Sequence, residues 1–196
     1  GGKNPLLVLA DANIRAAAAG TVRAAFSNTG QVCVGIERAY VVGDVYEEFV
    51  AELLHQVSRL RLGVGYDWDI DVGSLASAQQ LEAVSAHVSD AVAKGAFVLA
   101  GGRPRPDVGP FCYEPTVLAG VTEEMAVCRE ETFGPVLSLY RAASEDEAVE
   151  RANDSRYGLN ASVWSARRGP AVAARLRVGT VNVNEGYAAT WGSHAA

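Results

Sequence analysis

Short runs of apolar residues along the chain predict seven β-strands. Each run is bounded by glycine, proline or polar residues, and runs of this length are typical of strands that are buried on both faces. The predicted strands cover residues 6–10, 39–42, 97–100, 116–118, 136–140, 161–164 and 180–183.

Between several of these runs, apolar residues recur three or four positions apart, as they do on the buried stripe of a helix. The clearest stripe predicts a helix that Asp44 caps. This stripe consists of Tyr46, Phe49, Val50, Leu53, Leu54 and Val57. A second helix is expected to begin after Asn13 and to end near 28–30.

The second half of the chain carries the same helical pattern. A helix is predicted over residues 78–93, and Gly95 is expected to end it. Ser144 and Glu147 have the spacing of a capping box at the start of another helix. The last two predicted helices cover residues 144–153 and 169–176.

Alternation of strands and helices indicates an α/β fold with a twisted, largely parallel sheet and helices on both faces. Two stretches, 62–73 and 104–110, lack periodicity and are expected to be irregular connections. The chain has 196 residues, 49% of them hydrophobic, which suffices for one core. We therefore expect a single compact domain over residues 1–196.

Composition narrows the possible partners. A net charge of −6 disfavours nucleic-acid binding, and no apolar run approaches the ~20 residues of a membrane span. An odd number of cysteines, three, argues against a disulfide framework, so we expect a cytoplasmic protein. Scarce lysine beside abundant arginine, alanine, glycine and valine suggests a bacterial source. No residue is assigned to a metal.

Cys33 lies in the most informative stretch of the chain. The residues before it, Asn28, Thr29, Gly30 and Gln31, cannot supply a buried apolar surface. A polar, glycine-bearing setting suits a nucleophilic thiol, because the thiolate needs polar stabilisation. Most isolated cysteines are instead small apolar core residues. This role as a core packing residue is expected for Cys112 and Cys128, which have apolar and aromatic neighbours.

Histidine is the usual partner of a nucleophilic cysteine, and the chain has only His55, His87 and His194. None of the three has a recognisable motif around it. A cofactor-independent cysteine hydrolase or esterase is therefore a weaker alternative. A non-catalytic α/β module is another.

A second polar stretch precedes the strand predicted at 136–140. Glu130 and Glu131 are followed by Thr132, Phe133 and a Gly-Pro turn. Adjacent carboxylates are most often just a solvated loop. Here they lead into a strand, so we expect them where α/β sheets present groups to a ligand.

Five stretches, in the family's order, resemble motifs of the aldehyde dehydrogenase superfamily. The run from Phe26 to Cys33 resembles Phe-x-x-x-Gly-Gln-x-Cys, and the run from Glu131 to Pro135 resembles Glu-x-Phe-Gly-Pro. Residues 1–5 resemble the tail of Glu-Leu-Gly-Gly-Lys-x-Pro. Residues 156–164 and 179–184 resemble the family's Tyr-Gly-Leu stretch and its substrate-loop strand. The chain is identified on this basis as a catalytic-domain fragment of the superfamily.

The resemblance implies a mechanism and a site. Cys33 is the nucleophile that attacks an aldehyde, and its backbone N–H with an asparagine stabilises the oxyanion. Glu131 binds ribose hydroxyls of NAD or NADP, and Phe133 positions the nicotinamide ring. The residues expected around the substrate are Asn28, Gln31, Val32, Val34 and Asn184.

The resemblance also implies parts outside these 196 residues. The general-base glutamate, the oxyanion asparagine and the dinucleotide-binding domain are expected before Gly1. A C-terminal oligomerisation segment is expected after Ala196, so the whole enzyme would be a homo-oligomer.

The substrate expected from the resemblance is succinate semialdehyde, because residues 179–186 are similar to succinate-semialdehyde dehydrogenases. Those enzymes often place an arginine directly before Asn-Thr-Gly-Gln, where this chain has Ser27. Ala189 and Thr190 stand where a serine is often found. Arg38 or a residue outside the chain could supply the missing cation. The alternative is a broad-range aldehyde dehydrogenase.

Overall fold

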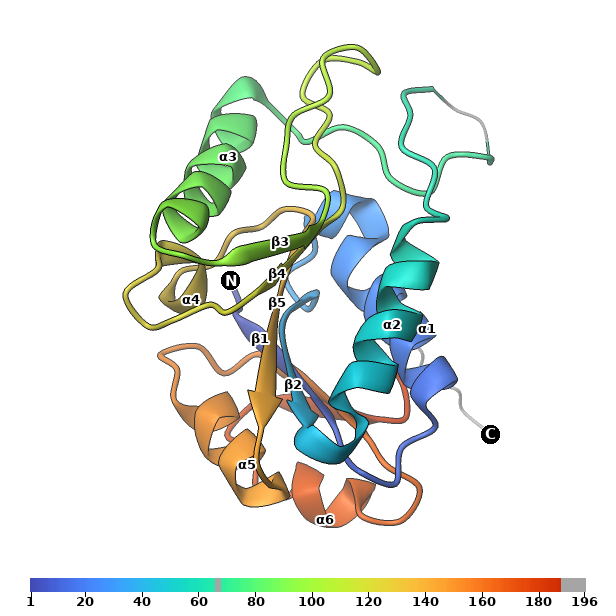
Figure 1. Ribbon diagram of the computed structural model, residues 1–196, viewed down its shortest axis with the longest axis vertical. Helices are drawn as coiled ribbons and strands as arrows, with labels where there is room; N and C mark the ends of the chain where they lie inside the picture. The colour runs from blue at the N-terminus through green and yellow to red at the C-terminus, as the bar shows by residue number, and fades with distance from the viewer. Residues whose placement is uncertain (66–67, 188–196) are drawn as a thin grey trace.

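The computed structural model describes residues 1–65 and 68–187. Its centre is a seven-stranded sheet in the order β3-β4-β5-β2-β1-β6-β7. Figure 1 labels β1 to β5 of this sheet. All neighbouring strands run parallel except β3 and β4. The predicted α/β class with a largely parallel sheet is confirmed. The strands are β1 (Asn4–Val8), β2 (Ile36–Val42), β3 (Phe97–Ala100), β4 (Thr116–Ala119), β5 (Val136–Ala142), β6 (Asn160–Trp164) and β7 (Thr180–Val183).

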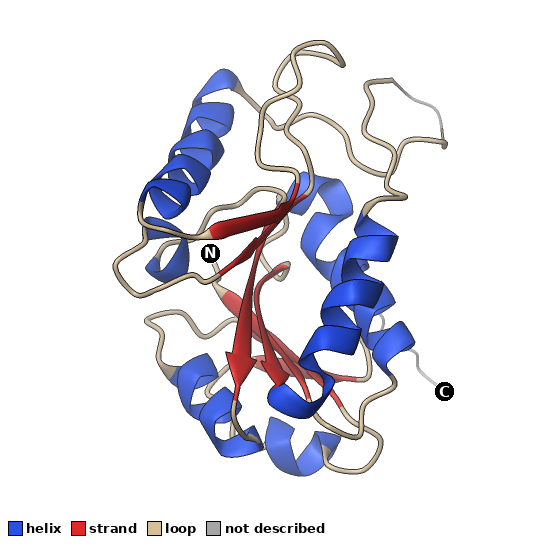
Figure 2. Cartoon of the chain, viewed as in Figure 1, coloured by secondary structure: helices blue, strands red, loops and turns tan. Residues whose placement is uncertain are grey.

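Helices cover both faces of this sheet, as Figure 2 shows. On one face α1 (Ile14–Phe26) and α2 (Tyr46–Val57) lie side by side. The other face is covered by four helices. They are α3 (Ala78–Ala93), α4 (Ala126–Arg129), α5 (Glu145–Asn153) and α6 (Gly169–Ala173).

The alternation of side chains along the strands explains the two layers. In β1, Leu6 and Val8 pack into the cluster under α1 and α2, whereas Leu7 packs into the cluster on the opposite face. Successive residues of a strand point to opposite faces, so a strand covered on both sides must be apolar throughout. Burial on both faces explains the continuous apolar run that predicted this strand. The strand itself begins two residues earlier than expected.

Two predicted helix starts had different outcomes. Ser144 caps α5: its hydroxyl accepts a hydrogen bond from the Glu147 N–H at 3.2 Å, while the Glu147 carboxylate accepts one from the Ala143 N–H at 2.7 Å. The prediction that Asp44 caps α2 was wrong. A 3-10 turn, η2 (Gly43–Val45), includes Asp44, and α2 starts after Val45 with no side-chain cap.

Helix ends also differ from their predicted positions. The helix predicted over 169–176 ends at Ala173. Gly95, at φ +98°, follows α3 as expected.

Over the described ranges, no helix combines the length and the apolarity needed to cross a membrane.

Candidate active site

The two polar stretches singled out from the sequence meet at one edge of the sheet. Cys33 lies between the turn η1 (Ser27–Gly30) and β2, and Glu131 and Phe133 lie just before β5. Because β2 and β5 are parallel neighbours, the segments that precede them share the amino edge. The expectation of a site at the usual ligand-binding edge, outside the carboxyl ends of the strands, was therefore wrong. Here the site segments lead into their strands.

The cysteine loop has an unusual backbone. Asn28, Thr29 and Gly30 all have positive φ values, of 50°, 59° and 70°, which reverse the chain after α1. The Asn28 amide donates to the Gln31 carbonyl at 3.0 Å, and the Gln31 amide oxygen accepts from the Ala76 N–H at 2.8 Å. Both side chains brace the loop, which leaves Cys33 exposed at its end.

Two buried asparagines, which the sequence analysis missed, fix the main chain around Cys33. Asn4 donates to the carbonyls of Cys33 at 3.0 Å and of Gly35 at 2.7 Å. Asn160 donates to the carbonyl of Val34 at 2.9 Å. The N–H of Cys33, by contrast, has no acceptor among the described residues. Both asparagines are the first residue of a buried strand, and that position in the sequence was the signal that could have identified them.

The other residues expected around the substrate have different surroundings. Val32 is half-buried beside Cys33, and Val34 is buried within the loop. Asn184 follows β7 at the opposite, carboxyl edge of the sheet, where its amide bonds both main-chain groups of Ser165 at 2.9 Å. The structure therefore brings Asn28, Gln31 and Val32 close to Cys33 in the loop, and places Asn184 elsewhere.

The loop before β5 presents Glu131 and Phe133, which are both half-buried, on either side of the buried Thr132. One oxygen of the Glu131 carboxylate, Oε1, accepts a hydrogen bond from the Gly2 N–H at 2.6 Å. The second oxygen, Oε2, accepts none from the residues described. A carboxylate oxygen without a donor, next to Gly1 and near a half-buried aromatic ring, suits the ribose and ring of a nicotinamide cofactor.

Arg38 cannot reach a substrate. Its side chain is buried, and its guanidinium donates to the Lys3 carbonyl at 2.8 Å, the Tyr40 hydroxyl at 3.0 Å and the Ala152 carbonyl at 3.2 Å. These bonds join β2 to the residue that precedes β1 and to α5. Of the two sources suggested for the missing cation, Arg38 and a residue outside the chain, the first was therefore wrong. Ala189, Thr190 and His194 lie outside the described residues.

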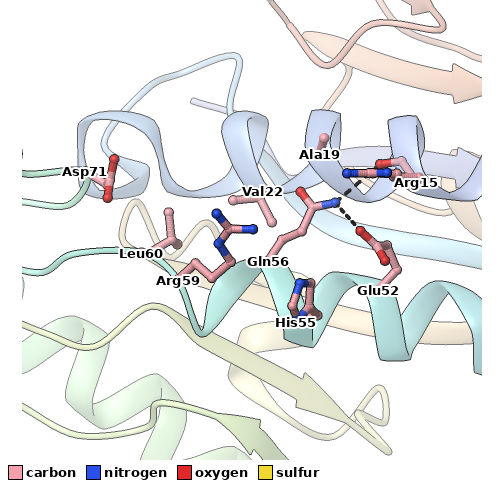
Figure 3. Close-up of a pocket in the computed structure, with 9 residues that line it drawn as sticks. All are labelled: Arg15, Ala19, Val22, Glu52, His55, Gln56, Arg59, Leu60 and Asp71. Carbon is pink, nitrogen blue, oxygen red and sulfur yellow. Dashed lines mark hydrogen bonds between the residues drawn. The ribbon is translucent and has the colours of Figure 1, made fainter.

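The two described histidines have separate settings. His87 of α3 lies with Nδ1 at 3.1 Å from the Thr132 hydroxyl, and burial, followed by the charge of Lys3, lowers its pKa. His55 lines a groove of about 670 Å³ along α1 and α2 (Figure 3). In that groove Gln56 donates to Glu52 at 2.7 Å. Cys33 is not part of its lining.

The two remaining cysteines are packing residues, as expected. Cys112 is buried, with 1% of its surface exposed, and burial raises the pKa of its thiol. Cys128 is half-buried and packs against the core cluster on the α5 face. The described residues contain no group of three or more histidine, cysteine or acidic side chains suited to a metal ion.

Comparison with known proteins defines the class. Residues 1–194 match the aldehyde dehydrogenase family. The fold agrees with a succinate-semialdehyde dehydrogenase from Burkholderia pseudomallei at a TM-score of 0.90 and 40% identity, covering 95% of this chain and 39% of that one. A betaine aldehyde dehydrogenase from Staphylococcus aureus, solved in complex with NAD+, gives a TM-score of 0.90 and 33% identity over 94% and 38% of the two chains. The chain belongs to the aldehyde dehydrogenase family.

Curated relatives also match the whole of this chain over only part of their own length. A putative succinate-semialdehyde dehydrogenase [NADP(+)] 2 from Mycobacterium bovis is 56% identical over 198 residues, which is all of this chain and 38% of that protein. A putative succinate-semialdehyde dehydrogenase [NADP(+)] from Mycolicibacterium smegmatis is also 56% identical, with the same coverage. The chain thus spans less than two-fifths of the length of these relatives.

Proposed function

We propose that this chain is the catalytic domain of a longer NADP-dependent aldehyde dehydrogenase that oxidises succinate semialdehyde to succinate. The observation that carries the proposal is the cysteine loop. It exposes the thiol, its carbonyls are fixed by Asn4 and Asn160, and the Cys33 N–H has no acceptor among residues 1–65 and 68–187. The names of the mycobacterial relatives support the substrate and the choice of NADP.

The chemistry begins at Cys33. Its thiolate attacks the aldehyde carbon, a C–S bond forms, and the carbonyl electron pair moves to oxygen. The Cys33 N–H then donates to this oxyanion, which stabilises charge where it develops. When bound, NADP+ supplies the acceptor for the hydride that leaves the carbon, so a thioester stays on Cys33. Water cleaves the thioester, the acid leaves, and the thiol is restored.

Other residues of this chain serve the cofactor. The free oxygen of Glu131 would accept hydrogen bonds from ribose hydroxyls, and the Phe133 ring would pack against the nicotinamide. The water-activating glutamate, the second oxyanion donor and the dinucleotide-binding domain are assigned to the part of the polypeptide that precedes Gly1. The chain covers only 38% of a mycobacterial relative, so a polypeptide of that length has room for these parts.

For the substrate carboxylate we propose Arg23. It lies in the last turn of α1, four residues before Ser27, the residue that follows the helix. Its guanidinium already holds a carboxylate, that of Glu185, at 2.8 Å. The arginine side chain is 55% exposed, and such a pair contributes only about 0–1 kcal/mol, so a substrate carboxylate can displace Glu185 at little cost.

The test measures NADPH formation by the complete polypeptide. Cys33→Ser should abolish turnover. Arg23→Met should raise the KM for succinate semialdehyde and leave that for butanal, an uncharged aldehyde of the same length, unchanged. Equal effects on both aldehydes would remove Arg23 from the proposal, and turnover by Cys33→Ser would remove Cys33.

An esterase alternative predicts a different result. A cofactor-independent hydrolase would turn over an activated ester rapidly without NADP+ and would form no NADPH from any aldehyde. That pair of results would replace the dehydrogenase proposal.

We further propose that the whole enzyme is a cytoplasmic bacterial homo-oligomer. The three free cysteines and the bacterial sources of the relatives support the location. The edge strand β3 exposes Phe97, Val98 and Leu99, an apolar surface of the kind that assembly covers. Light scattering of the complete polypeptide tests this, and a monodisperse monomer would refute it.

A further inference from the structure

The loop that presents Glu131 and Phe133 does not hold its own shape. Phe133 has a φ of +50°, in the left-handed region that bulky residues avoid. Among the described residues, no main-chain group bonds the N–H or the carbonyl of Thr132 or Phe133. Side chains from other elements must therefore fix this backbone.

Glu37, the second residue of β2, fixes the two N–H groups. Its carboxylate accepts from the Thr132 N–H at 2.9 Å and from the Phe133 N–H at 2.9 Å. Only 6% of Glu37 is exposed. Charge-assisted bonds of this kind are among the stronger ones in proteins.

Lys3 supplies the opposite charge that a buried carboxylate needs. Its Nζ lies 2.6 Å from Glu37 Oε2, and the lysine is 1% exposed. The same Nζ donates to the Thr132 hydroxyl at 3.3 Å. Breaking such a pair leaves an uncompensated charge in the interior.

Gln80 of α3 fixes the two carbonyl groups. Its amide nitrogen donates to the carbonyls of Thr132 and Phe133, both at 2.9 Å. Each main-chain polar group of these two residues is thus satisfied by Glu37 or Gln80. Side chains from two other elements thus hold the backbone between the half-buried Glu131 and Phe133.

We propose that Glu37, neutralised by Lys3, is a positioning residue for the cofactor. This inference rests on the proposed function. Glu37 does not touch the cofactor: it sets the backbone from which Glu131 meets the ribose and Phe133 meets the nicotinamide. The hydrogen bonds that hold the cysteine loop come from other residues, Asn4 and Asn160, so alkylation of the Cys33 thiol reports on that loop separately.

The experiment uses the complete polypeptide with Glu37→Gln, which keeps the shape of the side chain and replaces one accepting oxygen by a donor. The substitution removes one charge-assisted acceptor from the loop and the counter-charge of the buried Lys3, so the Kd and the KM for NADP+ should rise by at least about tenfold. The rate at which iodoacetamide alkylates Cys33 without cofactor should stay at the wild-type value. A matched control is Glu147→Gln, which alters another paired carboxylate, on α5, and should change neither quantity.

Two other results would contradict the positioning role of Glu37. An unchanged Kd for NADP+ in folded Glu37→Gln would overturn it. A parallel loss of NADP+ binding and of Cys33 alkylation would mean that Glu37 supports the fold in general. If Glu37→Gln does not fold, Gln80→Ala, which removes the donor to both carbonyls, should show the same selective rise in Kd.

A failure of the proposed function gives a distinct pattern. If the wild-type polypeptide binds no NADP+, the dehydrogenase proposal falls. The positioning role is then judged by amide hydrogen exchange. Glu37→Gln should speed exchange in peptides that cover 131–135 and leave 31–36 unchanged, and equal exchange in both variants would overturn it.

Discussion

Replacing Gly30 by alanine tests whether the two loops of the site are in direct contact. Gly30 ends η1 at a φ of +70°. A Cβ atom on it would lie well inside 3.0 Å of the carbonyl carbon and oxygen of Gly134, and 2.9 Å from the nitrogen of Pro135. These are main-chain atoms of the loop that carries Glu131, so they cannot rotate away as a side chain would.

Two destabilising effects add in the Gly30→Ala variant. A left-handed backbone costs a residue with a Cβ atom about 1–2 kcal/mol. Overpacking against a fixed backbone adds about 1–3 kcal/mol. Gly30→Ala should therefore lower the free energy of unfolding by about 2–5 kcal/mol. Gly95 supplies the matched control, because it has a φ of +98° and no described atom within 4 Å of its Cβ position. Gly95→Ala should lower the free energy of unfolding only by the cost of the left-handed backbone, about 1–2 kcal/mol.

Urea unfolding followed by circular dichroism measures both variants. The midpoints should fall in the order wild type, Gly95→Ala, Gly30→Ala, with unchanged slopes. Alkylation of Cys33 should also change in Gly30→Ala alone, because the cysteine loop has to move away from Gly134. Equal losses of stability in the two variants would refute the close approach.

Four further predictions follow from individual residues. Burial and the charge of Lys3 lower the pKa of His87 from its ordinary 6.5, so the unfolded chain binds more protons as the pH falls below 6.5 and the folded state loses stability. His87→Gln should flatten this loss between about pH 5 and pH 7, and an unchanged slope in urea midpoints would contradict it. Asn160→Ala should lower the free energy of unfolding by about 1–3 kcal/mol, because it leaves the buried carbonyl of Val34 unpaired; an unchanged midpoint would show that water replaces the amide. Iodoacetamide should label Cys33 well before the buried Cys112, as mapped by mass spectrometry, and indiscriminate labelling would argue against an assembled loop. The 196-residue chain alone should form no NADPH from aldehydes, and measurable NADPH would contradict the assignment of missing parts to the preceding sequence.

Patterns local to a few residues were predicted well. Apolar runs located the strands because a sheet covered on both faces requires continuous apolar sequence. The polar cluster from Asn28 to Gln31 located the loop that exposes Cys33, because such residues cannot form an apolar core. The same local logic failed at Asp44, where a 3-10 turn takes the place of a capped helix start.

Long-range pairing could not be predicted in this way. Lys3 and Glu37 lie 34 residues apart and meet only because β1 and β2 are neighbours in the sheet. Asn4 and Asn160 lie 156 residues apart and meet for the same reason across β1 and β6. The role of Arg38 was misjudged because its burial depends on α5, which packs against β2 from far along the chain.

The most direct test of the account is to trap the covalent intermediate. The complete polypeptide is mixed with succinate semialdehyde and NADP+, quenched in acid, digested and examined by mass spectrometry. The account predicts a succinyl thioester on Cys33 and on no other residue, with the adduct absent from Cys33→Ser. NADPH formation without any adduct on Cys33, or continued turnover by Cys33→Ser, would contradict it.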